Sequence, residues 1–187
     1  MRRAALLLSM LLAGTAQAVP ANPTDVEHLM QELGLASNAS GLNDVVTAAV
    51  VELKAMPGSS LQSAEQESCV HSVLLKGTMD GIRDNIVSGL GEDGSVVLAE
   101  WMTFLASPMG LAMSAKAAGA SEEDAAAMIT AMDPAELEKA KAFMASGNAE
   151  RLISSMGIQS VDGALIEQVV GRLEDACHVH IPENERS

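Results

Sequence analysis

The chain has 187 residues, a formal net charge of −14 at pH 7, and three aromatic residues with no tyrosine among them. Such an acidic surface repels nucleic acid and anionic lipid headgroups, because both are bound mainly through Lys and Arg. The hydrophobic content of 48% is too high for a disordered chain, and a core of Leu, Val, Ile, Met and Ala favours helices over sheets. We therefore predict an all-α protein that binds no nucleic acid.

The first eighteen residues have the three parts of a secretory signal. Arg2 and Arg3 precede an apolar run over 4–12, and small residues follow in Ala16-Gln17-Ala18. The apolar run is too short to cross a membrane, which takes about 20 residues, so we favour a cleavable signal over an N-terminal anchor. Cleavage after Ala18 would leave 169 residues in the periplasm with no stable membrane anchor.

The region after the signal is predicted to hold a short linker over 19–23 and then two amphipathic helices. Thr24 and Glu27 have the spacing of a capping box, in which each side chain satisfies a free amide of the first turn. The first helix then runs to about residue 33, and the apolar spacing predicts the second over about 42–56.

A longer helix is predicted to follow a second capping box, formed by Ser63 and Gln66. The apolar pattern extends to about Leu90. Gly77 and Gly81 lie inside it, and glycine weakens a helix interior by about 1 kcal/mol relative to alanine. We therefore expect a bend or a break near these two glycines.

The second half of the chain is predicted to form shorter helices, each behind a residue that caps a helix N-terminus. These helices begin after Ser95, Ser107, Ser121 and Asp133, a short segment covers 148–156, and the last helix covers about 161–178. Residues 24–180 are thus expected to form one domain. We predict a bundle of about seven or eight short amphipathic helices, with a frayed tail over 181–187.

The sequence contains an internal similarity. Residues 100–113 align with residues 139–152, so that Phe104 matches Phe143, Ser107 matches Ser146, and Met113 matches Leu152. Each copy reads as a helix carrying an aromatic residue, then Ala-Ser, then a new helix. Two copies are too few for a solenoid, so we predict two similar helix-turn-helix corners packed on one core.

The segment Phe104-Leu-Ala-Ser107-Pro108-Met-Gly110 resembles the signature of the DUF2059 family, exported bacterial helical proteins of unknown function. The family carries Tyr where this chain has Leu105, and the similar segment covers about 96–157. The resemblance implies a periplasmic helical domain and supplies no activity. The motif also has a structural explanation: Ser107 caps a helix, Pro108 starts it, and Gly110 permits close packing.

Cys69 and Cys177 are the two cysteines of the chain, and in an exported protein such a pair predicts one disulfide. It would tie the third helix to the last and close a loop of about 109 residues. The alternative is a zinc or copper site from Cys69, His71, Cys177, His178 and His180, since thiolate and imidazole are good ligands for both metals. The fourth histidine, His28, is expected on a solvated helix face.

Two further alternatives concern methionines and carboxylates. Met109 and Met113, and Met128 and Met132, are spaced i, i+4, and thioethers select Cu(I), although methionine also fills cores that lack aromatic residues.

The carboxylate alternative is a hydrolase. Glu100 beside Trp101 resembles half of a sugar-cleaving site, but neighbouring helical residues face different ways. The acidic run Glu122-Glu-Asp124 fits a helix N-terminus, where negative charge is stabilising.

No residue pattern identifies a nucleophile with its base or a phosphate-binding glycine loop, and none calls for a cofactor. We therefore expect a non-enzymatic protein that binds a protein partner or an apolar ligand through a groove between helices. The identity of the partner does not follow from the sequence.

Overall fold

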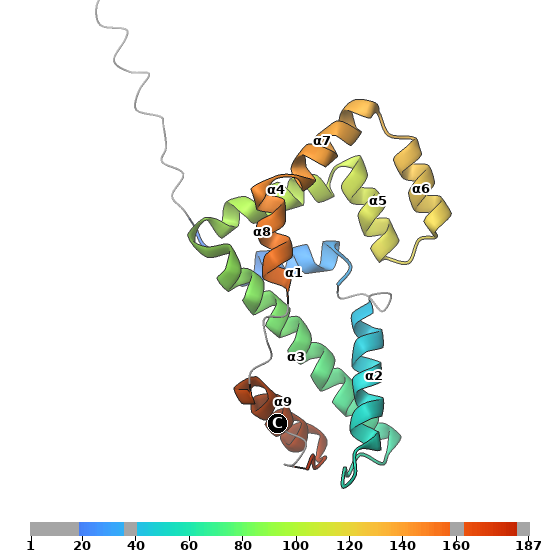
Figure 1. Cartoon of the computed structure of the whole chain (residues 1–187), viewed down its shortest axis with the longest axis vertical. Coiled ribbons are helices and arrows are strands. Elements are labelled where there is room, and N and C mark those ends of the chain that lie inside the picture. Colours follow the sequence, from blue (N-terminus) through green and yellow to red (C-terminus); the bar gives the residue numbers. More distant parts are fainter. Residues whose placement is uncertain (1–18, 36–40, 158–162, 183–187) are drawn as a thin grey trace, which may run out of the picture.

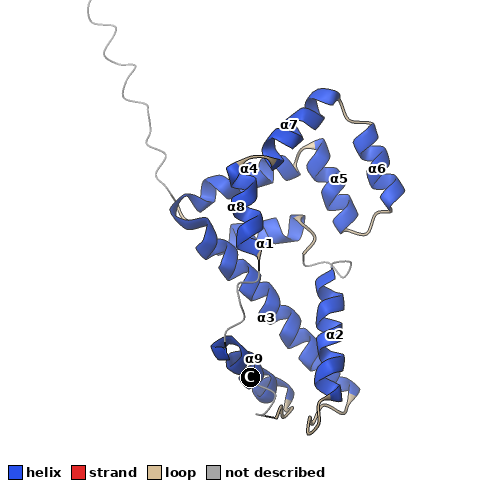
Figure 2. Cartoon of the chain, viewed as in Figure 1, coloured by secondary structure: helices blue, strands red, loops and turns tan. Residues whose placement is uncertain are grey.

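A computed structural model describes residues 19–35, 41–157 and 163–182, with the side chains of 163–168 excepted. These residues form helices and loops without strands (Figure 2), which confirms the predicted all-α fold. The predicted signal peptide lies outside the described residues. The helices are α1 (Pro23–Glu32), α2 (Gly41–Ala55), α3 (Ala64–Leu90), a 3₁₀ turn (Gly91–Asp93), α4 (Gly94–Leu105), α5 (Pro108–Ala117), α6 (Glu122–Thr130), α7 (Pro134–Met144), α8 (Gly147–Met156) and α9 (Gly163–Cys177).

Helix α3 runs unbroken through Gly77 and Gly81 over 27 residues, so of the bend or break that we expected there, the break does not occur. Figure 1 shows α3 crossing most of the molecule. The half before the glycines contacts α2 and α9, while the other half contacts α1 and α8. Tertiary packing at both ends holds the helix together and overrides the low helix propensity of two glycines.

Two helix starts differ from the prediction. Helix α1 begins at Pro23 with Asn22 as its cap, whose side chain accepts a hydrogen bond from the Thr24 amide at 3.0 Å. Thr24 is therefore inside the helix. Likewise α4 begins at Gly94, and the Ser95 amide, which we expected to lie at a cap, instead donates to the Val19 carbonyl oxygen at 3.0 Å. The segment that we predicted as a linker thus packs on the start of α4.

The other predicted caps are confirmed. Ser63 and Gln66 form the complete capping box of α3. Ser107, Ser121 and Asp133 each accept a hydrogen bond from a first-turn amide of α5, α6 and α7. These bonds link residues two or three positions apart, so the local sequence alone decides them.

Buried side chains form two clusters rather than one. The first cluster joins α1, α4, α8 and the C-terminal half of α3 around Trp101, which is 2% exposed, and includes Ala21, Leu29, Ile86 and Leu152. It contains both corners of the internal similarity. Ala21 was expected in a linker, but it lies against Gly94, where an added Cβ would come within 2.9 Å of the Ala21 Cβ.

The second cluster joins α2, the N-terminal half of α3 and α9. Its buried residues are Val50, Leu61, Val70, Val170, Leu173, Cys177, Val179 and Ile181. Ile181 is 5% exposed, so the frayed tail that we predicted from 181 begins too early. The chain after α9 is fixed by hydrogen bonds between the Ser60 amide and the His180 carbonyl oxygen, 3.2 Å, and between the His180 amide and Ser60 Oγ, 2.6 Å. Residues 183–187 lie outside the described residues.

Within the described residues no single helix is both long and apolar enough to cross a bilayer. The stretches Ala64–Leu105 and Pro108–Ala117 have the length and hydropathy of a membrane span only when taken together, and their axes are bent by 86° relative to each other.

Arg151 on α8 caps the C-terminal end of α3 by binding a free carbonyl oxygen there. Its guanidinium donates to the Leu90 carbonyl oxygen at 2.5 Å and to Asp93 Oδ1 at 2.6 Å, and this guanidinium holds the pKa of the Asp93 carboxyl below its usual range. A carboxylate with a lowered pKa stabilises the fold above its unfolded-state pKa of about 3.9, and this stabilisation is lost as pH falls through the lower folded-state value.

Asp93→Asn is therefore expected to lower the Tm slightly at pH 7, because exposed ion pairs contribute little. The difference from the unaltered chain should shrink as the pH falls below about 4. Thermal unfolding followed by circular dichroism across this range checks the expectation, with Glu92→Gln on the same turn as the control. Equal losses for both variants at every pH would contradict it.

Candidate functional site

The three aromatic side chains form one cluster. Trp101 and Phe104 lie on α4 and Phe143 lies on α7. The two phenylalanine rings are stacked, with centroids 4.4 Å apart and planes 18° apart, while Trp101 meets them edge-on at 5.8 and 5.1 Å. Contacts of this kind contribute about 0.5–1.5 kcal/mol each beyond the area that they bury. The three rings therefore link α4 to α7 through side chains.

The two corners of the internal similarity pack against each other. Ser107 opens α5 by accepting from the Gly110 amide at 3.3 Å, and Ser146 opens α8 by accepting from the Ala149 amide at 3.2 Å. Helix α4 contacts α8 and helix α7 contacts α5, so the first helix of each corner packs on the second helix of the other. Both corners contribute to the first cluster, as predicted, and the two matched phenylalanines meet between them.

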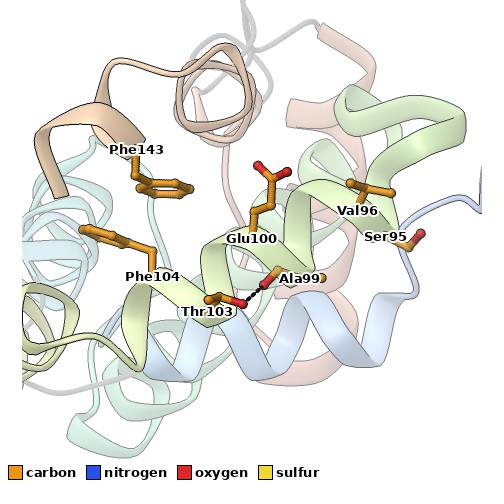
Figure 3. A pocket seen from close by; sticks show the side chains of 7 residues that line it. All are labelled: Ser95, Val96, Ala99, Glu100, Thr103, Phe104 and Phe143. Atoms are coloured by element: carbon orange, nitrogen blue, oxygen red, sulfur yellow. Dashed lines mark hydrogen bonds between the residues drawn. The ribbon is translucent and has the colours of Figure 1, made fainter. Parts of the chain in front are cut away.

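An open groove of about 610 Å³ runs along α4 beside the stacked rings. Figure 3 shows Phe104 and Phe143 at one end and Val96 with Ser95 at the other. The lining surface is mostly apolar, and Glu100 is its one charged residue. The residues that line it are Ser95, Val96, Ala99, Glu100, Thr103, Phe104 and Phe143.

Helix α4 exposes this groove because its sequence is apolar on more than one face. Val97, Leu98 and Trp101 enter the first cluster, whereas Val96, 45% exposed, and Ala99 face the solvent. Thr103 lies on the same side and turns its hydroxyl back onto the Ala99 carbonyl oxygen at 2.8 Å, which leaves its methyl group for the surface. A helix that is apolar all round is normally fully buried. Helix α4 has more apolar residues than the first cluster covers, and this excess is the sequence signal that could have identified the groove.

Glu100 is held in a fixed direction at the groove. Its Oε2 accepts a hydrogen bond from Asn148 Nδ2 at 2.8 Å, and the Asn148 Oδ1 in turn accepts from Arg151 Nη1 at 3.4 Å. The Asn148 backbone carbonyl also accepts from Trp101 Nε1 at 3.3 Å. Sequence reasoning did not identify Asn148, since a residue 48 positions away from Glu100 becomes its neighbour only when α8 packs on α4.

The predicted disulfide between Cys69 and Cys177 is present and ties α3 to α9, with Cα atoms 5.6 Å apart. Both sulfurs are therefore used in the bond. His71 lies on α3 and is half-buried, whereas His178 and His180 are exposed, and His180 Nδ1 lies 3.3 Å from Glu174 Oε1. No three or more His, Cys, Asp or Glu side chains within the described ranges are arranged to hold a metal ion.

The remaining candidates are dispersed. Met109 packs on the first cluster, while Met113 and Met128 are exposed at the surface and Met132 is half-buried. His28 is exposed, as predicted, 3.6 Å from Glu32.

The acidic candidates of the hydrolase hypothesis do not come together in the groove. Trp101 is buried while Glu100 is exposed, so they do not share a surface. Glu122, Glu123 and Asp124 occupy the first turn of α6. The groove holds a single carboxylate, whereas the hydrolase hypothesis requires a pair.

A second, smaller pocket of about 230 Å³ lies between α1 and α3 and is lined by charged and apolar side chains alike. Arg83 crosses it and pairs with Glu27 at 3.0 Å and with Asp80 at 3.1 Å. Lys76 pairs with Asp80 at 2.8 Å, and its ammonium group lowers the pKa of that carboxyl. The charges here compensate one another and join two helices, which accounts for the pocket as part of the fold.

Comparison with known proteins adds no functional assignment. No protein-family model, no curated protein and no solved structure matches the chain.

Proposed function

We propose that this protein is exported to the periplasm and binds a helix of a partner protein, without catalysing a reaction, in the groove along α4. The observation that carries the proposal is the open, mostly apolar groove beside the Phe104–Phe143 pair. Apolar area removed from water stabilises a complex by roughly 25 cal/mol per Å² before the costs of association. An apolar surface kept open on a rigid helix is typical of helix-in-groove recognition.

The shape of the groove favours a helix over a small apolar ligand. Small-molecule sites enclose most of the ligand surface, whereas Val96, Ala99, Glu100 and Thr103 all lie exposed along one side of α4. One face of α4 carries Val96, Ala99 and Thr103, which are spaced three and four positions apart. The side chains of Ala99 and Thr103 are small. A second helix laid along them would approach α4 closely and extend the packing of the first cluster.

Export is supported by the contacts of the residues just after the proposed cleavage point. The Val19 carbonyl oxygen accepts from the Ser95 amide, and Ala21 is buried against Gly94. Cleavage after Ala18 would retain both contacts. The Cys69–Cys177 disulfide fits an oxidising compartment.

We also propose a distant relationship to the DUF2059 family. Its support is the motif Phe104-Leu-Ala-Ser107-Pro108-Met-Gly110, which builds the corner between α4 and α5.

The binding proposal is tested with a neutral amphipathic peptide of leucine and glutamine, about 14 residues long, or four turns of helix. Neutral peptide avoids unspecific attraction to an acidic protein. We expect saturable binding in fluorescence anisotropy, and binding at least about tenfold weaker to Ala99→Asp, because the new carboxylate would lose water against the peptide.

The matched control is Val51→Asp on α2, where the side chain is 62% exposed, on a helix of the second cluster that does not line the groove. It adds the same charge and should bind like the unaltered chain. Circular dichroism melts of both variants would establish that each folds like the unaltered chain. Equal affinity for both variants, or no saturable binding at all, would contradict the proposal.

A further inference from the structure

The geometry around Glu100 points to a partner helix that carries an arginine or lysine side chain against this carboxylate. The inference rests on the proposed function, since it concerns the same groove. It adds the chemical class of the partner, a basic amphipathic helix, and a residue that selects it.

Glu100 is the one charge on the groove, and the surrounding protein orients it without neutralising it. Arg151 donates to the Asn148 Oδ1, which directs the Asn148 amide group, as the donor, toward Glu100 Oε2. The Asn148 side-chain amide has no net charge, so it supplies no counter-charge to the Glu100 carboxylate. Among the described residues no Lys, Arg or His forms an ion pair with Glu100.

Arg151, the nearest cation in this chain of hydrogen bonds, is already engaged elsewhere. Its guanidinium is bonded to Asp93 Oδ1, 2.6 Å, and to the Leu90 carbonyl oxygen, 2.5 Å. Glu100 Oε2 receives the Asn148 bond, and Figure 3 shows its carboxylate projecting from α4 on the side of the groove. A cation brought by the partner is the group that complements it.

A neutral or acidic helix in the groove would leave this carboxylate partly desolvated with its Asn148 hydrogen bond but without an opposite charge, which costs free energy. An arginine or lysine would pair with it, and its aliphatic stem would lie on apolar surface beside the groove. Glu100 therefore acts as a specificity residue, and Asn148 positions it.

The test uses the neutral leucine–glutamine peptide and a series of its variants, each with arginine at one glutamine position. We expect at least one variant to bind the unaltered protein about three- to fivefold more tightly than the neutral peptide, the gain of one exposed ion pair. Glu100→Gln keeps an oxygen to accept from Asn148 and should abolish that gain, which is measured in each variant as the ratio of its affinities for the arginine peptide and the neutral peptide. Asn148→Ala should reduce the same ratio.

Glu92→Gln is the matched control, because it removes the same charge from an exposed position on the 3₁₀ turn outside the groove. It should retain the full arginine preference. The inference is overturned if no arginine position improves binding, or if the arginine preference survives Glu100→Gln. In that case the proposed function still stands as long as Ala99→Asp weakens binding of the neutral peptide. If the unaltered protein binds no peptide at all, the proposed function itself is overturned.

Discussion

Removing the Cys69–Cys177 disulfide is expected to lower the free energy of unfolding by about 4–5 kcal/mol, the chain-entropy value for a loop of this length. The two cysteines are 108 positions apart, so the bond excludes many extended conformations of the unfolded chain. The double variant Cys69→Ser, Cys177→Ser tests this in urea unfolding monitored by circular dichroism.

Reductant provides the control for this experiment. It should destabilise the unaltered protein to the level of the double variant and leave the double variant unchanged. If the oxidised protein and the double variant unfold at the same urea concentration, the disulfide contributes nothing and the prediction fails.

The loss of stability on removing the disulfide should also differ between the two clusters. Helix α9 is held to α3 by the second cluster and the disulfide, whereas α4 and α8 belong to the first cluster. Structural units with few contacts to the remaining protein open separately. Removing the disulfide should therefore accelerate hydrogen exchange more in α9 than in α8. Equal acceleration in both helices would contradict the division into two clusters.

The second large effect is expected at Gly110, where α5 turns away from α4. A Cβ atom at this position would overlap the Phe104 carbonyl oxygen and the Leu105 Cα, and it would lie 2.5 Å from the Leu105 carbonyl oxygen. These are backbone atoms, so no side-chain rotation relieves the overlap. Overpacking costs about 1–3 kcal/mol and occasionally more, and we expect Gly110→Ala to cost about 3 kcal/mol or more because α4 and α5 must separate.

Gly147→Ala is the matched control for Gly110→Ala. It lies at the start of α8, in the corner related to the first by the internal similarity, and a Cβ there would meet no atom within 4 Å. We expect a gain of about 0.4–1 kcal/mol, since alanine restricts the unfolded chain more than glycine does. Urea unfolding of both variants measures the contrast, and equal effects would contradict the close approach of α4 and α5.

The two corners differ at this point for a structural reason. The position of Gly110 in the first copy is taken by Ala149 in the second, and Ala149 is fully buried. The second corner thus accommodates a Cβ where the first does not. The close packing that we predicted at Gly110 is confirmed, but only the structure shows that the second corner, which the sequence predicts to be of the same kind, leaves room for a Cβ at the matching position.

Local features of this protein follow from the sequence alone. The capping bonds of Ser63, Ser107, Ser121 and Asp133 connect residues a few positions apart, and the helical spacing of apolar residues places most helices within a few positions of where they lie. The pairing of Cys69 with Cys177 follows because two cysteines allow one intramolecular bond. The capping bonds and the helix positions do not depend on how distant segments pack, whereas the disulfide also requires α3 and α9 to approach each other in the second cluster.

Tertiary structure decided the rest, because the deciding contacts join distant segments. The start of α4 depends on Val19 and Ala21, the continuity of α3 on the clusters at its two ends, and the burial of Ile181 on α2 and α3. The candidate site has the same origin. Glu100 and Phe104 stand on α4, but Asn148 and Phe143 reach them only when the second corner packs on the first, since residues some 40 to 50 positions apart are brought together by burial of apolar surface rather than by any local preference.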